Sequence, residues 1–448
     1  HHILGYFEKQ VNTPYKIIIT KNSKLWGAGS LKKKTLNDTT DIYYADNYKD
    51  LIHSPILYSI PDTVSFKIDN STFKISCAGN DTSLNAEKIK ELLTAPLSEI
   101  LKHSDYRHEE YTFLYYSEYS VITPGLRALE HPNSTLVCYH SAMLDNKILL
   151  SSSIHEFIHA VYAPLRIRSE ITNAFDFLNP VCDDFLWFYE GVTEYLSLKV
   201  LLNSGVYSHT EFLDELDYSN ETYKNINFSK TSSNIYNNRK QKLFENFYTK
   251  GSLFAFLLDI EIIKLSDGKT NLFDVMQNLQ KKYTPDISFN SDDFISELES
   301  AAGVEIAPFL LKNTTKKNKI EVEKVIEEIG YDKSQQDTII WSFRPRKTYM
   351  ISNFRENKFQ IAYKGSIINK EQKSNKLIIK EIDNISLSWF NYDRLVSPHN
   401  GEEIELLINT GENDFAIKTK PVQIKKQKII WILNENYQKN LAHDFWNN

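Results

Sequence analysis

The sequence predicts an α+β protein of several domains, with a β-rich first part, a mainly α-helical middle that contains a small sheet, and a β-rich last part. Short β-branched and aromatic runs come first, a helical period dominates the middle, and strand patterns return near the end. A chain of 448 residues is long enough for about two to four domains. The expected domains are residues 1–82, 83–335 and 336–448.

The composition is that of an ordinary globular protein, with 41% hydrophobic and 25% charged residues. The formal net charge of −6 is small for this length and argues against a nucleic-acid-binding surface. The longest apolar run extends from Leu253 to Leu265, but Asp259 and Glu261 interrupt it. No segment is therefore expected to span a bilayer.

The cysteines and the start of the chain carry little information about function. Cys77, Cys138 and Cys182 are widely spaced and form no metal or redox motif, so they are expected to be free thiols in the core. The chain begins with His1-His2 rather than Met and carries no signal segment. We therefore expect the N-terminal domain to be truncated.

The first part contains strand patterns separated by polar and glycine-containing turns. These runs are 15–20, 41–44, 64–68 and 73–76. His53 is interpreted as an ordinary loop or surface histidine. Nothing in this part carries obvious chemistry.

The pattern becomes helical at Ser83, where a capped helix with an apolar stripe is expected to begin. Two strands follow, 111–116 and 135–139, and a turn-rich loop is predicted over 123–134. This loop holds Glu130 and, next to it, a histidine. The two side chains could line a cleft, although a solvated loop would have the same local sequence.

The central motif is an H-E-x-x-H pattern formed by His155, Glu156 and His159. If this segment is helical, the two histidines lie one turn apart on the same face and can bind one metal ion. Glu156 lies beside them and could transfer a proton. The serines at 151–153 can cap the start of this helix, and Pro164 marks its end.

A second apolar helix is expected over 185–198, and it carries Glu190 and Glu194 one turn apart. A zinc site with two histidines and one glutamate leaves its fourth position open for water. Glu190 could be the third protein ligand of such a site. Glu194 could accept a hydrogen bond from a ligand histidine and hold its ring in one tautomer.

Further helices are expected over 209–217, 243–265 and 291–302, and Gly303 ends the last of them. The polar residues 219–242 are interpreted as a surface excursion.

Beyond Lys316, a helix and linker are expected to about residue 337, followed by strands and by a hairpin turn at Gly411. The predicted strands are 376–380, 403–408, 415–418 and 429–432.

These motifs, in this order, resemble the glycyl aminopeptidase family of zinc metallopeptidases, which belongs to the gluzincins. The resemblance rests on the H-E-x-x-H pattern, on Pro-Leu-Arg-Ile-Arg from Pro164, on Trp-Phe-Tyr-Glu-Gly-Val-Thr-Glu-Tyr over 187–195, on Leu-Glu-His ending at His131, and on Tyr-Thr-Lys-Gly over 248–251. It spans about residues 40 to 330, and the 31 positions from His159 to Glu190 fit the glycyl group.

The resemblance implies a thermolysin-like catalytic domain and a role for each matching residue. His155, His159 and Glu190 would bind one zinc ion per chain. Glu156 would be the general base for a zinc-activated water. Tyr248 would act with zinc to stabilise the oxyanion.

The resemblance also implies two supporting roles. Glu130 would bind the free α-amino group of the substrate, and Glu194 would orient His155. The family usually has glycines immediately before Leu-Glu-His, whereas this chain has Arg127 and Ala128 there. These two residues are expected to reshape the floor of the substrate cleft.

The last part resembles the PDZ-like domain that often ends members of this family. A carboxylate-binding Gly-hydrophobic-Gly loop is not found ahead of its first strand, so a lid or spacer is expected rather than a peptide-capturing module. The resemblance also favours a periplasmic, secreted or lipoprotein location.

The predicted function is zinc-dependent hydrolysis of the N-terminal peptide bond of peptides with a free N-terminus, with a preference for small residues such as Gly or Ala. Two alternatives remain open. One is a peptide-binding protein with a residual metal site, and the other is a zinc endopeptidase in which Glu130 does not reach the amine. Retention of Glu156 and Tyr248 favours an enzyme, because a binding scaffold needs no general base.

Overall fold

The computed structural model describes most of the chain. The described residues are 11–79, 84–106, 110–118, 126–140, 146–174, 179–222, 226–236, 243–317, 321–342, 348–353, 358–363, 377–383, 385–386, 402–409, 414–419, 422–434 and 439–447.

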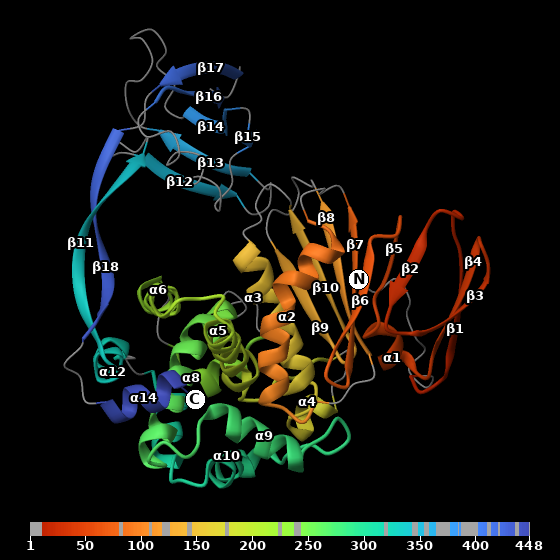
Figure 1. Cartoon of the computed structure of the whole chain (residues 1–448), viewed down its shortest axis with the longest axis horizontal. Helices are drawn as coiled ribbons and strands as arrows, with labels where there is room; N and C mark the ends of the chain where they lie inside the picture. The colour runs from red at the N-terminus through yellow and green to blue at the C-terminus, as the bar shows by residue number, and fades with distance from the viewer. Residues whose placement is uncertain are drawn as a thin grey trace.

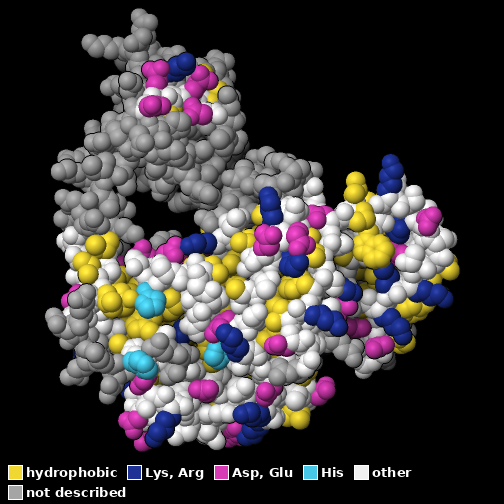
Figure 2. All heavy atoms as spheres, in the orientation of Figure 1, with side chains coloured by type: hydrophobic (Ala, Val, Ile, Leu, Met, Phe, Trp, Pro, Cys, Tyr) yellow, Lys and Arg dark blue, Asp and Glu magenta, His cyan; other side chains and the backbone are white. Residues whose placement is uncertain are grey.

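The chain begins with two small antiparallel sheets, as the strand patterns predicted (Figure 1). One has the order β1-β4-β3, and the other pairs β2 with β5. Their elements are β1 (Tyr15–Thr20), β2 (Trp26–Gly29), β3 (Lys32–Asn37), β4 (Thr40–Ala45), the short helix α1 (Tyr48–Ile52) and β5 (Ile56–Ser59). Lysines and acidic side chains are interspersed over the visible face of this part (Figure 2), in keeping with the small net charge.

A five-stranded sheet of order β6-β7-β8-β10-β9 lies between these sheets and the helices (Figure 1). Its strands are β6 (Thr63–Ile68), β7 (Ser71–Gly79), β8 (Glu110–Glu118), β9 (Arg127–His131) and β10 (Ser134–His140). β7, β8 and β10 run parallel, and β9 is an antiparallel edge strand. Helix α2 (Ala86–Lys102) connects β7 to β8 and contacts β6 and β7. Because strands from both sides of residue 82 share this sheet, the position of the first domain boundary stays a prediction.

The predicted loop over 123–134 is wrong for its second half, because residues 127–131 form strand β9. Its turn-forming residues do reverse the chain at Pro132 and Asn133, but β10 offers an edge with which β9 pairs in register. Thr135 lies opposite Glu130 in this pairing. Glu130 therefore sits on a strand whose backbone is held in place. Residues 123–125 lie outside the described part of the chain.

The middle of the chain is mainly helical, as predicted (Figure 1). Its elements are α3 (Asn146–Val161), α4 (Glu170–Asn173), the π-helix η3 (Trp187–Val192), α5 (Thr193–Asn203), α6 (His209–Thr222), α7 (Phe228–Ser232), α8 (Glu245–Leu265), α9 (Leu272–Lys282), η5 (Ser291–Asp293), α10 (Phe294–Ala302), α11 (Ala307–Thr314) and α12 (Val322–Glu328). Gly303 adopts a left-handed conformation after α10, as expected for a helix C-terminus.

Three details of the helical part differ from the sequence-based expectations. The serines at 151–153 do not cap α3, because it begins at Asn146 and its first turns already bury Leu149 and Leu150. The predicted surface excursion 219–242 includes α7, which buries Phe228 in the core. Polar sequence around one large aromatic residue concealed this helix. The third, the π-helical conformation of η3, concerns the site directly.

The C-terminal part contains the predicted strands. A six-stranded sheet has the order β12-β13-β14-β16-β17, with β15 added beside β14. Its strands are β12 (Thr348–Asn353), β13 (Lys358–Tyr363), β14 (Leu377–Ile382), β15 (Ile385–Ser386), β16 (Ile404–Asn409) and β17 (Asp414–Thr419). Gly411 lies outside the described residues, between the antiparallel strands β16 and β17. The PDZ-like character of this part stays a prediction.

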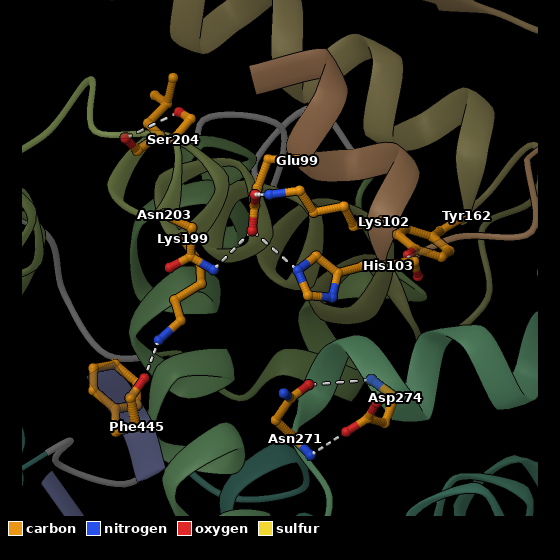
Figure 3. Close-up of polar contacts among 11 residues, drawn as sticks. Glu99, Lys102, His103, Tyr162, Lys199, Asn203, Ser204, Asn271, Asp274 and Phe445 are labelled. Atoms are coloured by element: carbon orange, nitrogen blue, oxygen red, sulfur yellow. Dashed lines mark hydrogen bonds and ion pairs between the residues drawn. The ribbon is translucent and has the colours of Figure 1, made fainter. Parts of the chain in front are cut away.

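A long antiparallel ribbon of β11 (Tyr331–Ser342) and β18 (Val422–Leu433) joins the C-terminal sheet to the helical part (Figure 1). The last helix, α14 (Lys439–Asn447), then packs against α8. Its Phe445 is fully buried, and the Lys199 ammonium donates a hydrogen bond to the Phe445 carbonyl (Figure 3). Trp446 stacks on His209 at 4.2 Å and donates to the Ile329 carbonyl at 2.9 Å. These contacts hold helix α14 against the helical core.

Two other features agree with the sequence-based expectations. Cys77, Cys138 and Cys182 form no disulfide; Cys77 is buried and the other two are half-buried, and burial raises the pKa of the Cys182 thiol to about 12. Among the described residues, no helix combines the length and hydropathy that crossing a membrane requires.

The buried Lys199 makes the stability of the protein depend on pH. Burial lowers its pKa from 10.5 to about 8, although Asp259 acts in the opposite direction. Between these values the unfolded chain binds the proton more completely than the folded protein, so the free energy of unfolding should rise with pH, by at most about 3 kcal/mol. Urea unfolding of wild type and Lys199→Met at pH 7.5 to 10.5 measures this contribution. It is the difference between the two proteins in how the free energy of unfolding changes with pH. Parallel curves would contradict it, and the exposed Lys67→Met is the control.

Candidate metal centre

The two histidines of α3 and Glu190 of η3 meet in the interior. His155 is 5% exposed and His159 is 2% exposed, one turn apart on the same helix. Glu190 Oε2 lies 3.5 Å from His155 Nε2 and 3.4 Å from His159 Nε2. One ligand atom from each residue lies within 4.8 Å of the others, so the three can hold one metal ion. The structure therefore brings together the three residues singled out in the sequence.

The other ring nitrogen of each histidine is held by an acceptor on the far side. His155 Nδ1 lies 2.7 Å from Glu194 Oε2, and His159 Nδ1 lies 2.6 Å from the Ala163 carbonyl. Since a carbonyl or carboxylate oxygen can only accept, each Nδ1 carries the hydrogen and each Nε2 keeps its lone pair. Both lone pairs are therefore available beside Glu190. The Ala163 acceptor was not foreseen, since a backbone carbonyl leaves no mark in a residue pattern.

Glu190 is presented by a π-helix rather than by the α-helix that was predicted. Trp187 to Val192 is π-helical, and the α-helical conformation resumes at Thr193. Single π-helical turns inside a helix are frequent at functional sites because they redirect side chains. Here Glu190 faces the two Nε2 atoms, while Glu194 reaches the outer nitrogen of His155. One continuous helical segment thus supplies both the inner and the outer partner of that ring.

The charges in the site are strongly coupled. Burial alone would raise the pKa of Glu190, but the two imidazoles, when they are protonated at Nε2, outweigh burial and hold this pKa well below its usual value. Burial and the Glu130 carboxylate raise the pKa of Glu156 to about 7. Burial likewise raises the pKa of Glu130, and the neighbouring Glu190 acts in the same direction. Three carboxylates gathered in a buried space favour a cation among them.

These residues fit a zinc ion by an independent criterion, the state of their buried oxygens. Glu190 Oε2 and Glu156 Oε2 are buried and have no hydrogen-bond partner among the described residues. A buried carboxylate oxygen without a partner is costly unless it binds a cation or a ligand. Two imidazole nitrogens and one carboxylate oxygen, with a second carboxylate beside them, form the donor set of a catalytic zinc site.

Tyr248 reaches the site because two glycines allow their helices to touch. α8 crosses η3 where Gly251 meets Gly191, and a Cβ atom on Gly251 would lie 2.8 Å from Gly191 Cα. The crossing brings the Tyr248 ring to 5.4 Å from the His155 ring. Burial, and then the Glu190 carboxylate, raise the pKa of the Tyr248 hydroxyl, which therefore stays protonated. The glycine of the Tyr-Thr-Lys-Gly motif is therefore needed for the close packing of α8 on η3.

Glu130 borders the same cluster from the edge strand β9. Its side chain is half-buried, and its charge interacts with His159, Glu190 and His155. Arg127, at the start of β9, is exposed, whereas Ala128 packs against the hydrophobic core. The edge strand therefore places Glu130 beside helix α3, which carries the two histidines.

The loop between α3 and η3 is organised by Asp183, which the sequence analysis did not single out. Asp183 is 3% exposed and accepts hydrogen bonds from Tyr189 Oη at 2.7 Å, from Thr172 Oγ1 at 2.8 Å and from Ser169 Oγ. The same Tyr189 hydroxyl accepts from Ser169 N at 3.1 Å. Tyr189 directly precedes Glu190, so this network fixes the backbone that carries the third ligand. An Asp in a polar loop gives no signal in the sequence, since it looks like any surface residue.

Comparison with known families agrees with this site. Residues 149–254 match the family model described as M61 glycyl aminopeptidase, and residues 1–60 match that of the Peptidase M61 N-terminal domain. The resemblance inferred from the motifs is thereby confirmed for these two stretches. The chain is a peptidase, a hydrolase that acts on peptide bonds. No curated protein sequence matches the chain.

Solved structures were compared with the same chain. An aminopeptidase N family protein from Idiomarina loihiensis is 18% identical with a TM-score of 0.68, and the match covers 98% of this chain and 80% of that chain. An M1 zinc metallopeptidase from Deinococcus radiodurans, in a variant bound to a Tyr-Ser-Ala substrate, is 10% identical with a TM-score of 0.48. That match covers 68% of this chain and 64% of the other. The first likeness shows a shared fold, with N-terminal β-sheets and a helical middle.

The contact between the glycines yields a test of how the site is positioned. In Gly251→Ala the new methyl group would press on the backbone of Gly191, so we expect a loss of about 1–3 kcal/mol of stability and weaker zinc binding. Unfolding in urea and competition with a chelator measure the two effects.

Gly205→Ala is the matched control for this variant, because Gly205 has a positive φ of 77° but no atom lies within 4 Å of the place that a Cβ would take. It should lose stability through backbone strain and keep full zinc affinity. Equal zinc affinity in both variants would show that the crossing does not position Glu190.

Proposed function

We propose that the protein is a zinc aminopeptidase that removes small N-terminal residues, such as Gly or Ala, from peptides. The observation that carries this proposal is the buried convergence of His155, His159 and Glu190, whose ligand atoms lie within 4.8 Å of one another. A buried glutamate, a tyrosine hydroxyl and a third carboxylate border the same cluster. The preference for small residues follows the description of the matched family.

Zinc held by the three ligands would supply a Lewis acid that polarises the scissile carbonyl and lowers the pKa of a water. Glu156, next to the ligand His155, would take a proton from that water at its carboxylate and return it to the leaving amine. Its unpartnered Oε2 atom is available for this exchange. The Tyr248 hydroxyl, which stays protonated, would donate a hydrogen bond to the oxyanion.

Glu130 would select for a free N-terminus. A carboxylate in a half-buried position on the edge strand can bind the substrate ammonium group by a charge-assisted hydrogen bond. β9 is the edge strand of its sheet, and an extended peptide can lie along such an edge. Glu194 would keep His155 in the tautomer that binds zinc. Peptides with a free N-terminus are thus the proposed substrates.

A zinc endopeptidase is the second candidate, and it differs only in whether Glu130 meets a charged amine. A peptide-binding protein with a residual metal site is supported less well. A purely structural site would have no use for a buried general base beside its ligands, and Glu156 is retained there with a buried, unpartnered oxygen.

The first test concerns zinc and the general base. We expect wild-type protein to bind one zinc ion per chain and to cleave Gly- and Ala-naphthylamides. Glu156→Gln should keep the zinc and lose about 10²–10⁴-fold in kcat, because the amide cannot accept a proton. Metal analysis and steady-state kinetics measure both, with the exposed Glu305→Gln as control. Absence of stoichiometric zinc, or turnover unaffected by Glu156→Gln, would refute the enzyme mechanism proposed above.

The second test concerns the free N-terminus. Glu130→Gln should lower kcat/KM for peptides with a free amine by about 10–100-fold, mainly through KM, because a charge-assisted hydrogen bond is lost. Wild type should cleave N-acetylated peptides far more slowly than peptides with a free amine. In the variant the difference between these two rates should be smaller. Equal rates for both peptides in wild type would favour the endopeptidase instead.

A further inference from the structure

A second concave region lies where the N-terminal sheets meet the catalytic part. It is bordered by α1, by the turn between β9 and β10, by the loop after α3 and by the turn that holds Pro285 and Asp286. Residues of α1 and of α4 line it, and Figure 1 labels both helices. We call it the α1–α4 cavity. It encloses about 370 Å³, at the lower end of the range for ligand pockets, which suits a molecule of one or two amino-acid residues.

Arg168 forms the buried wall of this cavity. It is 8% exposed, and its guanidinium is held by a hydrogen bond from Nη2 to the Pro285 carbonyl. Its backbone carbonyl accepts from Phe289 N at 3.0 Å, so the residue is fixed at both ends. Its Nε atom is buried and has no acceptor among the described residues. A guanidinium stays charged even when buried, so it presents an unused donor and a positive charge to the cavity.

Lys49 adds a second cation from helix α1. Lys49 is exposed overall and lines the same cavity as Arg168. Partial burial lowers its pKa and the charge of Arg168 lowers it further, while Asp286 acts in the opposite direction, so the two cations repel each other. Neither cation forms an ion pair with a carboxylate within 4.0 Å among the described residues. An anionic group between them would relieve the repulsion and use the free Nε donor of Arg168.

The cavity also carries the opposite charge. Asp50 and Asp286 line it, so with His53 neutral the charged side chains balance. Asp286 is exposed, whereas Arg168 is buried. His53, interpreted from the sequence as an ordinary loop histidine, lines this cavity as well. A simple anion would be opposed by the two carboxylates, but a molecule with both charges matches the whole lining.

Asn133 adds a neutral polar group from the turn after β9. Its Oδ1 atom is buried and has no partner among the described residues. Asn133 follows Glu130 by three positions along the strand and its turn, which places the cavity on the order of 10 Å from Glu130. It is therefore close to the metal centre but separate from its ligands.

We propose that the α1–α4 cavity binds a small zwitterion, an amino acid or a short peptide, with its carboxylate on Arg168 and Lys49 and its ammonium group toward Asp286. The binding itself does not depend on the proposed function. If the enzyme releases amino acids, the ligand comes either from the free product or from the C-terminus of a short peptide substrate.

Calorimetric titration of the zinc-loaded full chain tests the binding. Glycine should bind with one site in this cavity and more tightly than acetate or methylammonium, each of which carries only one of the two charges. Lys49→Gln should weaken glycine binding about tenfold or more, because a charge-assisted contact is lost. Lys67→Gln, which removes an exposed lysine of β6 outside the cavity, should bind like wild type.

Glu130→Gln separates this cavity from the metal centre, and it should keep glycine binding in the cavity unchanged. Binding that is lost in Glu130→Gln but kept in Lys49→Gln would place glycine at the metal centre and overturn the proposal. If glycine binds no more tightly than acetate, the proposal that the ligand is a zwitterion is wrong. These results stand whether or not the enzyme cleaves N-terminal residues.

The source of the ligand follows from kinetics on dipeptides and their C-terminal amides. If the cavity takes the C-terminus of a substrate, Lys49→Gln should lower kcat/KM for the free acid by about tenfold and leave the amide unchanged. If it takes the free amino acid, kcat/KM of both substrates should be the same as in wild type.

Discussion

A buried carboxylate placed between two imidazole nitrogens is the constraint on which the rest of the structure depends. Glu190 Oε2 lies within 3.5 Å of both Nε2 atoms, in a space that Glu156 and Glu130 also border. Lone pairs that face one another in a buried site are unfavourable unless a cation lies among them. The elements around the site therefore hold a geometry that would relax if the residues were free to move apart.

Three kinds of contact maintain this geometry. Acceptors on the outer nitrogens orient the rings, with Glu194 on His155 and the Ala163 carbonyl on His159. The Asp183 network fixes the backbone before Glu190, and the contact of two glycines lets α8 approach η3 closely enough to bring in its tyrosine. The Glu194 contact and the contact of the two glycines join segments far apart in the chain, whereas the Ala163 and Asp183 contacts act over shorter stretches. The site is thus a product of the packing of the helical core and not of any single motif.

The same core also holds the end of the chain and borders a second polar region. Lys199, on the helix that continues from the third ligand, holds α14 through the Phe445 carbonyl. On the other side, the loop after the metal-binding helix carries Arg168 into the α1–α4 cavity. The segments next to the proposed ligands therefore make two further contacts. Helix α5 contacts the C-terminal helix, and the loop after α3 lines the cavity beside the N-terminal sheets.

The sequence by itself determined that β-rich parts precede and follow a helical part, and it singled out the three proposed metal ligands and the flanking Glu156, because these depend on local periodicity and on the one-turn spacing of side chains. It also indicated Tyr248 and Glu130, but only through a family resemblance. Tertiary structure decided that residues 127–131 form a strand, since an edge strand exists only where a neighbour offers its hydrogen bonds. It likewise decided the π-helical turn at Glu190, the acceptor at Ala163 and the role of Asp183. Each of these features depends on the course of the folded backbone, and no local pattern of residue types records it.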